Sequence, residues 1–164
     1  AWLLRDDVPA VPPIGISPAR PPATPDALPA QGIESRLIGF IEDPSAPLDS
    51  TTWFDLEGVT FRTASTALSP GSRAQIGILA EILTLFPSVR LTVAGHTDNQ
   101  GDPGDNINLS AGRAQSVAAA LQQRGIDPQR LTVLGLGAQR PIADNATAAG
   151  RARNRRIAVQ VTAR

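Results

Sequence analysis

Several chemically reactive residues are absent or rare in this sequence. The 164 residues include no cysteine, all 15 basic residues are arginine, and there is one histidine. Without cysteine there are no disulfides, thiolate zinc sites or cysteine nucleophiles. One histidine excludes a site that needs two imidazoles, and no apolar run approaches the roughly 20 residues of a membrane-spanning helix. The composition therefore predicts a module with few reactive groups and no cofactor.

The charge balance excludes a second set of functions. Fifteen basic residues oppose 15 acidic residues, which gives a formal net charge of +0. A nucleic-acid partner usually requires a strong cationic excess, and an anionic membrane surface attracts clusters of basic residues. We therefore expect neither a nucleic-acid partner nor electrostatic docking on a lipid surface.

Proline divides the chain into three parts. Eight of the 15 prolines lie in the first 29 residues, so residues 1–31 are expected to form an extended linker. The opening residues Ala1-Trp2-Leu3-Leu4, followed by charged residues, resemble the edge of a membrane helix, and a fortuitous apolar start is the alternative. Residues 32–48 are expected to form a short helix and a connection, and residues 49–164 the main domain.

Apolar periodicity in the main domain predicts an α/β sandwich. The expected elements are strands over residues 53–61, 89–95, 131–136 and 157–161, and helices over residues 70–86 and from Ser110 to Arg124. The order β-α-β-α-β-β predicts a small mixed four-stranded sheet, and right-handed crossovers place both helices on one face.

Two oppositely charged residues near the second expected helix are the most informative about function. Asp98 follows the carboxyl end of a strand, where α/β sheets commonly bind ligands. With Ser110 as the N-cap, Arg113 occupies the third helical position. There the unfavourable interaction of a cation with the helix dipole destabilises the helix by roughly 0.3–1 kcal/mol. A residue that is unfavourable for local helix stability, such as a cation in the first turn, is often present because it has a function. The pair would suit the ammonium and carboxylate of an amino-acid head group, and a plain Asp98–Arg113 salt bridge is the alternative.

Four motifs in and around this region identify a family. They are Gly-His-Thr-Asp-Asn-Gln-Gly at residues 95–101, Asn-Ile-Asn-Leu-Ser-Ala-Gly-Arg-Ala at 106–114, Gly-Leu-Gly-Ala-Gln-Arg-Pro at 135–141 and Asn-Arg-Arg-Ile at 154–157. In order and spacing, residues 53–161 resemble the OmpA-like C-terminal domain, as in the periplasmic domains of OmpA, the Pal lipoprotein and the MotB stator protein. The resemblance implies an α/β fold and non-covalent binding of peptidoglycan through the meso-diaminopimelate of its stem peptide.

The resemblance also implies which residues hold the ligand. The two residues that grip it would be Asp98 and Arg113, with supporting contacts from Thr97, Asn106, Leu109 and Arg155. The first strand departs from the pattern, because many relatives carry an acidic residue directly after the phenylalanine, whereas Arg62 follows Phe61 here.

A metal-dependent hydrolase that uses His96 and Asp98 is the alternative function. His-x-Asp can bind a metal, but further ligands would have to come from Asp102 or Asp105. A hydrogen-bonded structural histidine is the competing interpretation of His96. No Gly-x-Ser-x-Gly nucleophile elbow is present, so a serine hydrolase is not expected.

These observations predict a non-enzymatic protein of a Gram-negative cell envelope. Its domain would bind peptidoglycan in the periplasm while an N-terminal anchor holds it to the outer or the inner membrane. The sequence leaves open which membrane that is, and whether the domain forms a homodimer.

Overall fold

The computed structural model describes residues 32–164, and the proline-rich segment 1–31 with its expected anchor lies outside the described residues. The described elements are α1 (Ile33–Glu42), β1 (Phe54–Asp55), α2 (Ser72–Leu85), β2 (Arg90–His96), α3 (Pro103–Gln123), the 3-10 turn η2 (Pro128–Arg130), β3 (Leu131–Gly137), α4 (Ala148–Asn154) and β4 (Arg156–Ala163). The predicted α/β class is confirmed.

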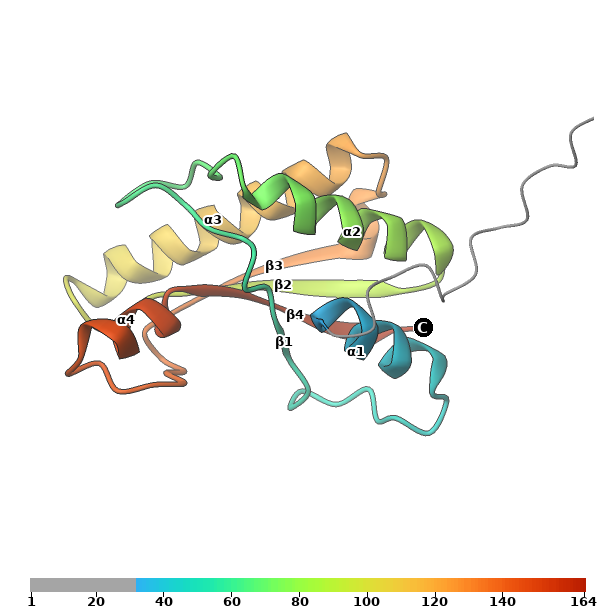
Figure 1. Cartoon of the computed structure of the whole chain (residues 1–164), viewed down its shortest axis with the longest axis horizontal. Helices are drawn as coiled ribbons and strands as arrows, with labels where there is room; N and C mark the ends of the chain where they lie inside the picture. Colours follow the sequence, from blue (N-terminus) through green and yellow to red (C-terminus); the bar gives the residue numbers. More distant parts are fainter. Residues whose placement is uncertain (1–31) are drawn as a thin grey trace, which may run out of the picture.

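The four strands form one mixed sheet in the order β1-β4-β2-β3. Strands β2 and β3 run parallel, with Val93 opposite Val133, while β4 is antiparallel to both β2 and β1. Helices α2 and α3 pack against each other, and α3 lies along β2 and β3, as Figure 1 shows. The parallel β2–α3–β3 unit brings the end of β2 and the middle of α3 to the same side of the domain.

One hydrophobic core joins the helices to the sheet. Ile157, Val159 and Val161 of β4 belong to this core, and the intervening Ala158 and Gln160 are buried as well, so both faces of the strand are covered and not only the predicted one. The predicted short helix is also confirmed, since α1 adds Leu37 and Ile38 to the same core.

The first strand is much shorter than predicted. Pairing with β4 is limited to Phe54 and Asp55, and Phe61 makes only an isolated bridge to Leu68. The chain turns after Leu56, where the backbone N–H of Val59 donates to the Leu56 carbonyl at 3.2 Å. This turn ends the strand and directs residues 61–68 towards α3.

The predicted start of the second helix is wrong. Helix α3 begins at Pro103, and its N-cap is Asp102, whose side chain accepts from the backbone N–H of Asp105 at 3.0 Å. Ser110 is a fully buried residue in the middle of the helix. Arg113 consequently lies well inside α3, and the argument that it opposes the helix dipole at the first turn does not hold.

Helix α4 was not among the expected elements. The Thr147 side chain caps it by accepting from the backbone N–H of Gly150 at 2.9 Å. Among the described helices, none combines the length and apolar character that crossing a membrane requires.

Candidate functional site

Arg113 is a buried cation on α3 whose orientation is fixed by the segment 61–68. Its Nε donates to the carbonyl of Ser65 at 2.9 Å, and its guanidinium carbon lies 5.1 Å from the centre of the Phe61 ring. Only 8% of the residue is exposed. With Nε used and the plane held by the ring, the two terminal nitrogens remain for another partner.

Those terminal nitrogens have no acidic partner in the part of the chain that the structure describes. The two ion pairs among the described residues are Asp98–Arg155 and Asp55–Arg156. The alternative of a direct Asp98–Arg113 salt bridge is therefore not realised. Burial, and then the positive charge of Arg155, lower the pKa of Arg113, while the negative charge of Asp98 acts in the opposite direction. A buried cation without a counter-ion is costly, and an anion arriving at it would remove part of that cost.

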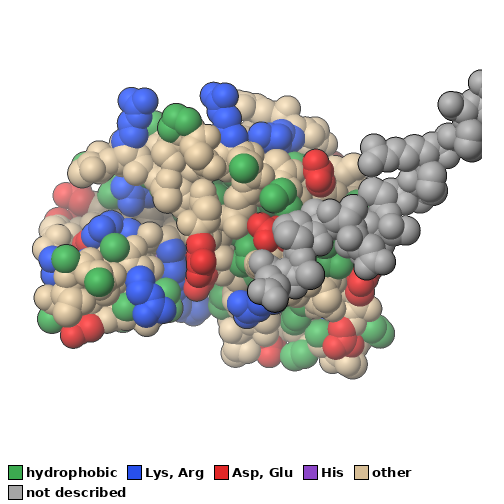
Figure 2. Space-filling view, viewed as in Figure 1, with side chains coloured by type: hydrophobic (Ala, Val, Ile, Leu, Met, Phe, Trp, Pro, Cys, Tyr) green, Lys and Arg blue, Asp and Glu red, His purple; other side chains and the backbone are tan. Residues whose placement is uncertain are grey.

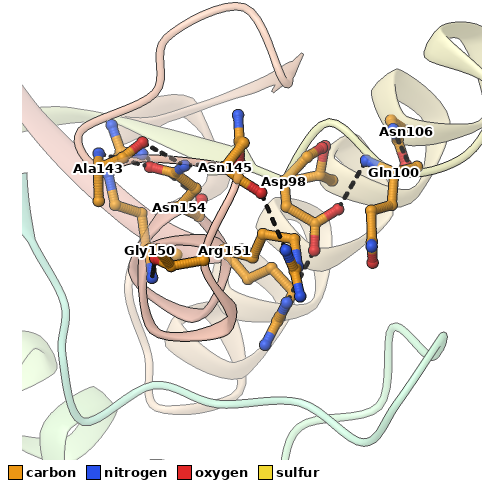
Figure 3. A network of polar contacts seen from close by, with 12 residues as sticks. Asp98, Gln100, Asn106, Ala143, Asn145, Gly150, Arg151 and Asn154 are labelled. Atoms are coloured by element: carbon orange, nitrogen blue, oxygen red, sulfur yellow. Dashed lines mark hydrogen bonds and ion pairs between the residues drawn. The ribbon is translucent and has the colours of Figure 1, made fainter.

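Asp98 lies two residues beyond the end of β2 and is held from two sides, as Figure 3 shows. Its Oδ1 accepts from the backbone N–H of Gln100 at 3.0 Å, and its Oδ2 accepts from Nη1 of Arg155 at 2.7 Å. Burial raises the pKa of Asp98, but these hydrogen bonds and the charges of Arg155 and Arg151 outweigh it and hold that pKa below its usual value. The carboxylate is therefore ionised and fixed in direction.

Asp98 and Arg113 line one cleft of about 560 Å³, together with Arg155, Arg156 and His96. Segment 61–64 forms another part of its wall. Figure 2 shows basic side chains gathered over the lobe formed by α4 and the adjoining surface. The cleft thus holds a carboxylate and guanidinium groups close together, and their contact with a ligand stays a prediction.

The three supporting residues Thr97, Asn106 and Leu109 are not part of the cleft lining. Thr97 is buried, and its Oγ1 donates to the backbone carbonyl of Asp98 at 2.8 Å. Nδ2 of Asn106 donates to the carbonyl of Gln100 at 2.9 Å. These two side chains therefore hold the loop that carries Asp98, and a direct ligand contact from them or from Leu109 stays a prediction.

Asn154 is a positioning residue for which no role was predicted. It is fully buried at the end of α4, where its side chain accepts from the backbone N–H groups of Ile142 and Ala143 and donates to the Ala143 carbonyl and to Asn145 (Figure 3). This fixes the backbone directly before Arg155. The sequence alone gives little indication of this positioning role, because the hydrogen-bond partners of the asparagine lie in a separate loop.

His96 is buried, but the described residues offer no metal site around it. It is 3% exposed, and its Nδ1 is the one buried side-chain nitrogen or oxygen in the described residues that lacks a hydrogen-bond partner. Within residues 32–164, no group of three or more potential metal ligands is present. The hydrolase alternative therefore gains no support from the geometry.

The burial of His96 predicts a pH-dependent stability. Burial, with the positive charges of Arg156 and Arg140, lowers the pKa of His96 to about 4. The pKa of a histidine in the unfolded chain is about 6.5. Between these two pKa values the unfolded state binds more protons than the folded state, so the free energy of unfolding decreases as the pH falls. We expect the urea midpoint to decrease from pH 7 to pH 5, and to decrease less in His96→Gln. Because the chain has one histidine, an equal decrease in both proteins would contradict this assignment.

The fold is a small α/β domain with a mixed four-stranded sheet, and its cleft is lined by groups of both charges. The model of the OmpA family matches residues 60–155. The chain therefore belongs to the OmpA family, and with that family it is a structural protein of the cell envelope and not an enzyme.

Individual relatives agree with this assignment. The outer-membrane lipoprotein YfiB of Pseudomonas aeruginosa is 36% identical over 137 residues, covering 82% of either chain. The peptidoglycan-binding protein ArfA of Mycobacterium tuberculosis is 33% identical over 148 residues, which are 90% of this chain and 41% of ArfA. The crystal structure of the peptidoglycan-associated lipoprotein from Burkholderia pseudomallei superimposes with a TM-score of 0.59 at 25% identity, covering 76% of this chain and 99% of that one.

Proposed function

We propose that this domain binds peptidoglycan non-covalently and recognises the meso-diaminopimelate of the stem peptide. The observation that carries the proposal is the buried Arg113, which lines the cleft and forms no ion pair among the described residues. A guanidinium fork in this state favours a carboxylate that it can hold with two parallel hydrogen bonds.

The carboxylate of Asp98 supplies the second half of the recognition. An ionised carboxylate offers about four lone-pair positions, of which Gln100 and Arg155 use one on each oxygen. A ligand ammonium in the cleft can therefore bind Asp98 while the ligand carboxylate binds Arg113. In a stem peptide, the free end of diaminopimelate carries both groups on one carbon, so its two charges are close enough for one small cleft.

The names of two cell-envelope relatives support peptidoglycan as the ligand. ArfA is named as peptidoglycan-binding and the Burkholderia lipoprotein as peptidoglycan-associated, and both align with most of this chain. We further propose that residues 1–31 connect the domain to a membrane anchor.

Binding to cell walls of two chemistries tests the proposal. A lysine-type wall lacks the carboxylate that Arg113 would hold, so loss of one charge-assisted hydrogen-bond partner should weaken binding by about one to two decades. We expect the chain to co-sediment with purified sacculi that contain meso-diaminopimelate and much less with lysine-type sacculi. Equal co-sedimentation with both would overturn the proposal.

A further inference from the structure

The cleft carries one more positive charge than a zwitterionic ligand end would neutralise. Its charged lining residues are Asp98, Arg113, Arg155 and Arg156. Arg156 is already neutralised by Asp55, with 3.0 Å between its Nε and Oδ1. Asp98 can balance only one of the two remaining arginines, so the cleft has an excess of about one positive charge, and a ligand end with one ammonium and one carboxylate leaves that excess in place.

Arg155 is the arginine that can respond to a further anion. Its side chain is 44% exposed, and Asp98 is its partner in the unliganded cleft. Its backbone is anchored, because its N–H donates to the Arg151 carbonyl at 3.1 Å and the preceding Asn154 is fully buried. The guanidinium can therefore change direction while its point of attachment stays fixed.

We propose, on the basis of the function proposed above, that Arg155 selects ligands with a second free carboxylate. The ammonium of the ligand binds a free lone-pair position of Asp98 and partly neutralises that carboxylate, which weakens its hold on Arg155, and the guanidinium turns to the second carboxylate. A ligand end with one ammonium and two carboxylates then balances Asp98, Arg113 and Arg155 charge for charge. In chemical terms, the preferred ligand is a stem peptide that ends at diaminopimelate, with the carboxylates on both of its stereocentres free.

Two synthetic peptides measure this preference. One is L-Ala-γ-D-Glu-meso-diaminopimelate, and the other is the same tripeptide amidated only at the carboxylate of the peptide-linked stereocentre. Isothermal titration calorimetry with the full chain gives the ratio of the two affinities. We expect the amide to bind about tenfold more weakly, the lower end of what one charge-assisted hydrogen bond contributes, because Arg155 is partly exposed.

The variant Arg155→Gln should bring this ratio close to one. Arg153→Gln is the matched control, since it removes an exposed arginine of α4 that is not part of the cleft lining, and it should keep the ratio. A wild-type ratio near one, or a tenfold ratio that persists in Arg155→Gln, overturns the inference.

A third peptide separates this inference from the function on which it rests. Amidation at the other stereocentre, beside the free ammonium, removes the carboxylate proposed for Arg113. If this change has no effect on binding, the proposed function fails, and the inference fails with it. If it weakens binding while the first amidation does not, only the role of Arg155 is refuted.

Discussion

Arg113→Leu is expected to reduce the affinity for meso-diaminopimelate sacculi by roughly 100-fold, or about 3 kcal/mol, while leaving the free energy of unfolding unchanged or higher. The two effects have one cause. The guanidinium is buried without an ion-pair partner in the described structure, so its charge costs folding free energy that the Ser65 carbonyl and the Phe61 ring offset only in part, and a ligand carboxylate would offset more of it. Leucine fills similar space beside Phe61 without a charge.

The combination of the two measurements makes this prediction specific. Urea unfolding reports stability, and co-sedimentation or calorimetry reports binding. Arg90→Gln is the control, because Arg90 is exposed at the opposite end of β2 from His96 and should leave both quantities unchanged. Sacculus binding by Arg113→Leu at wild-type affinity would remove Arg113 from the site.

Elements with clear apolar periodicity were predictable from the sequence. The alternation of Ile157, Val159 and Val161 predicted β4, and the near-continuous apolar residues from Leu131 predicted β3. In β4 the pattern corresponds to burial, whereas β3 is an edge strand of the sheet in which only Gly137 is buried, so its apolar residues predicted the strand but not its exposure.

Polar helix segments were missed because their stability comes from caps and tertiary contacts. The first turns of α3 contain Asn106 and Asn108 together with a glycine, a composition typical of a loop, although the Asp102–Pro103 cap-and-proline signal was present. Helix α4 has a threonine cap but no apolar stripe. In such segments a cap is better evidence than hydrophobicity.

Three of the six predicted site residues, Asp98, Arg113 and Arg155, line one cleft, and the pairing between them was not predicted. The sequence indicated Asp98 and Arg113 as two charges on one cleft, and they do line one cleft. The partner of Asp98 is Arg155, which is 57 residues away in sequence. That contact depends on where Asn154 and the loop before α4 place the backbone, and no spacing rule along the chain contains this information.

Gly95→Ala is expected to destabilise the domain by about 3–5 kcal/mol, or to prevent folding. A Cβ atom at Gly95 would lie 2.0 Å from the carbonyl oxygen of Ser110 and 2.7 Å from its carbon. Both are backbone atoms of α3, so a side-chain rotation cannot relieve the clash, and the helix has to move away from β2. The measurement is urea unfolding of the purified chain, followed by circular dichroism.

Gly39→Ala is the matched control for this substitution. Gly39 lies inside α1, and a Cβ atom there would meet no other part of the described chain within 4 Å, so alanine should stabilise the chain by about 0.5–1 kcal/mol through helix propensity. A Gly95→Ala protein as stable as wild type would mean that α3 does not lie this close to β2. Because Arg113 follows Ser110 by less than one helical turn, the same close approach fixes the depth of its guanidinium in the cleft. A displaced α3 would therefore weaken sacculus binding in any fraction of Gly95→Ala that still folds.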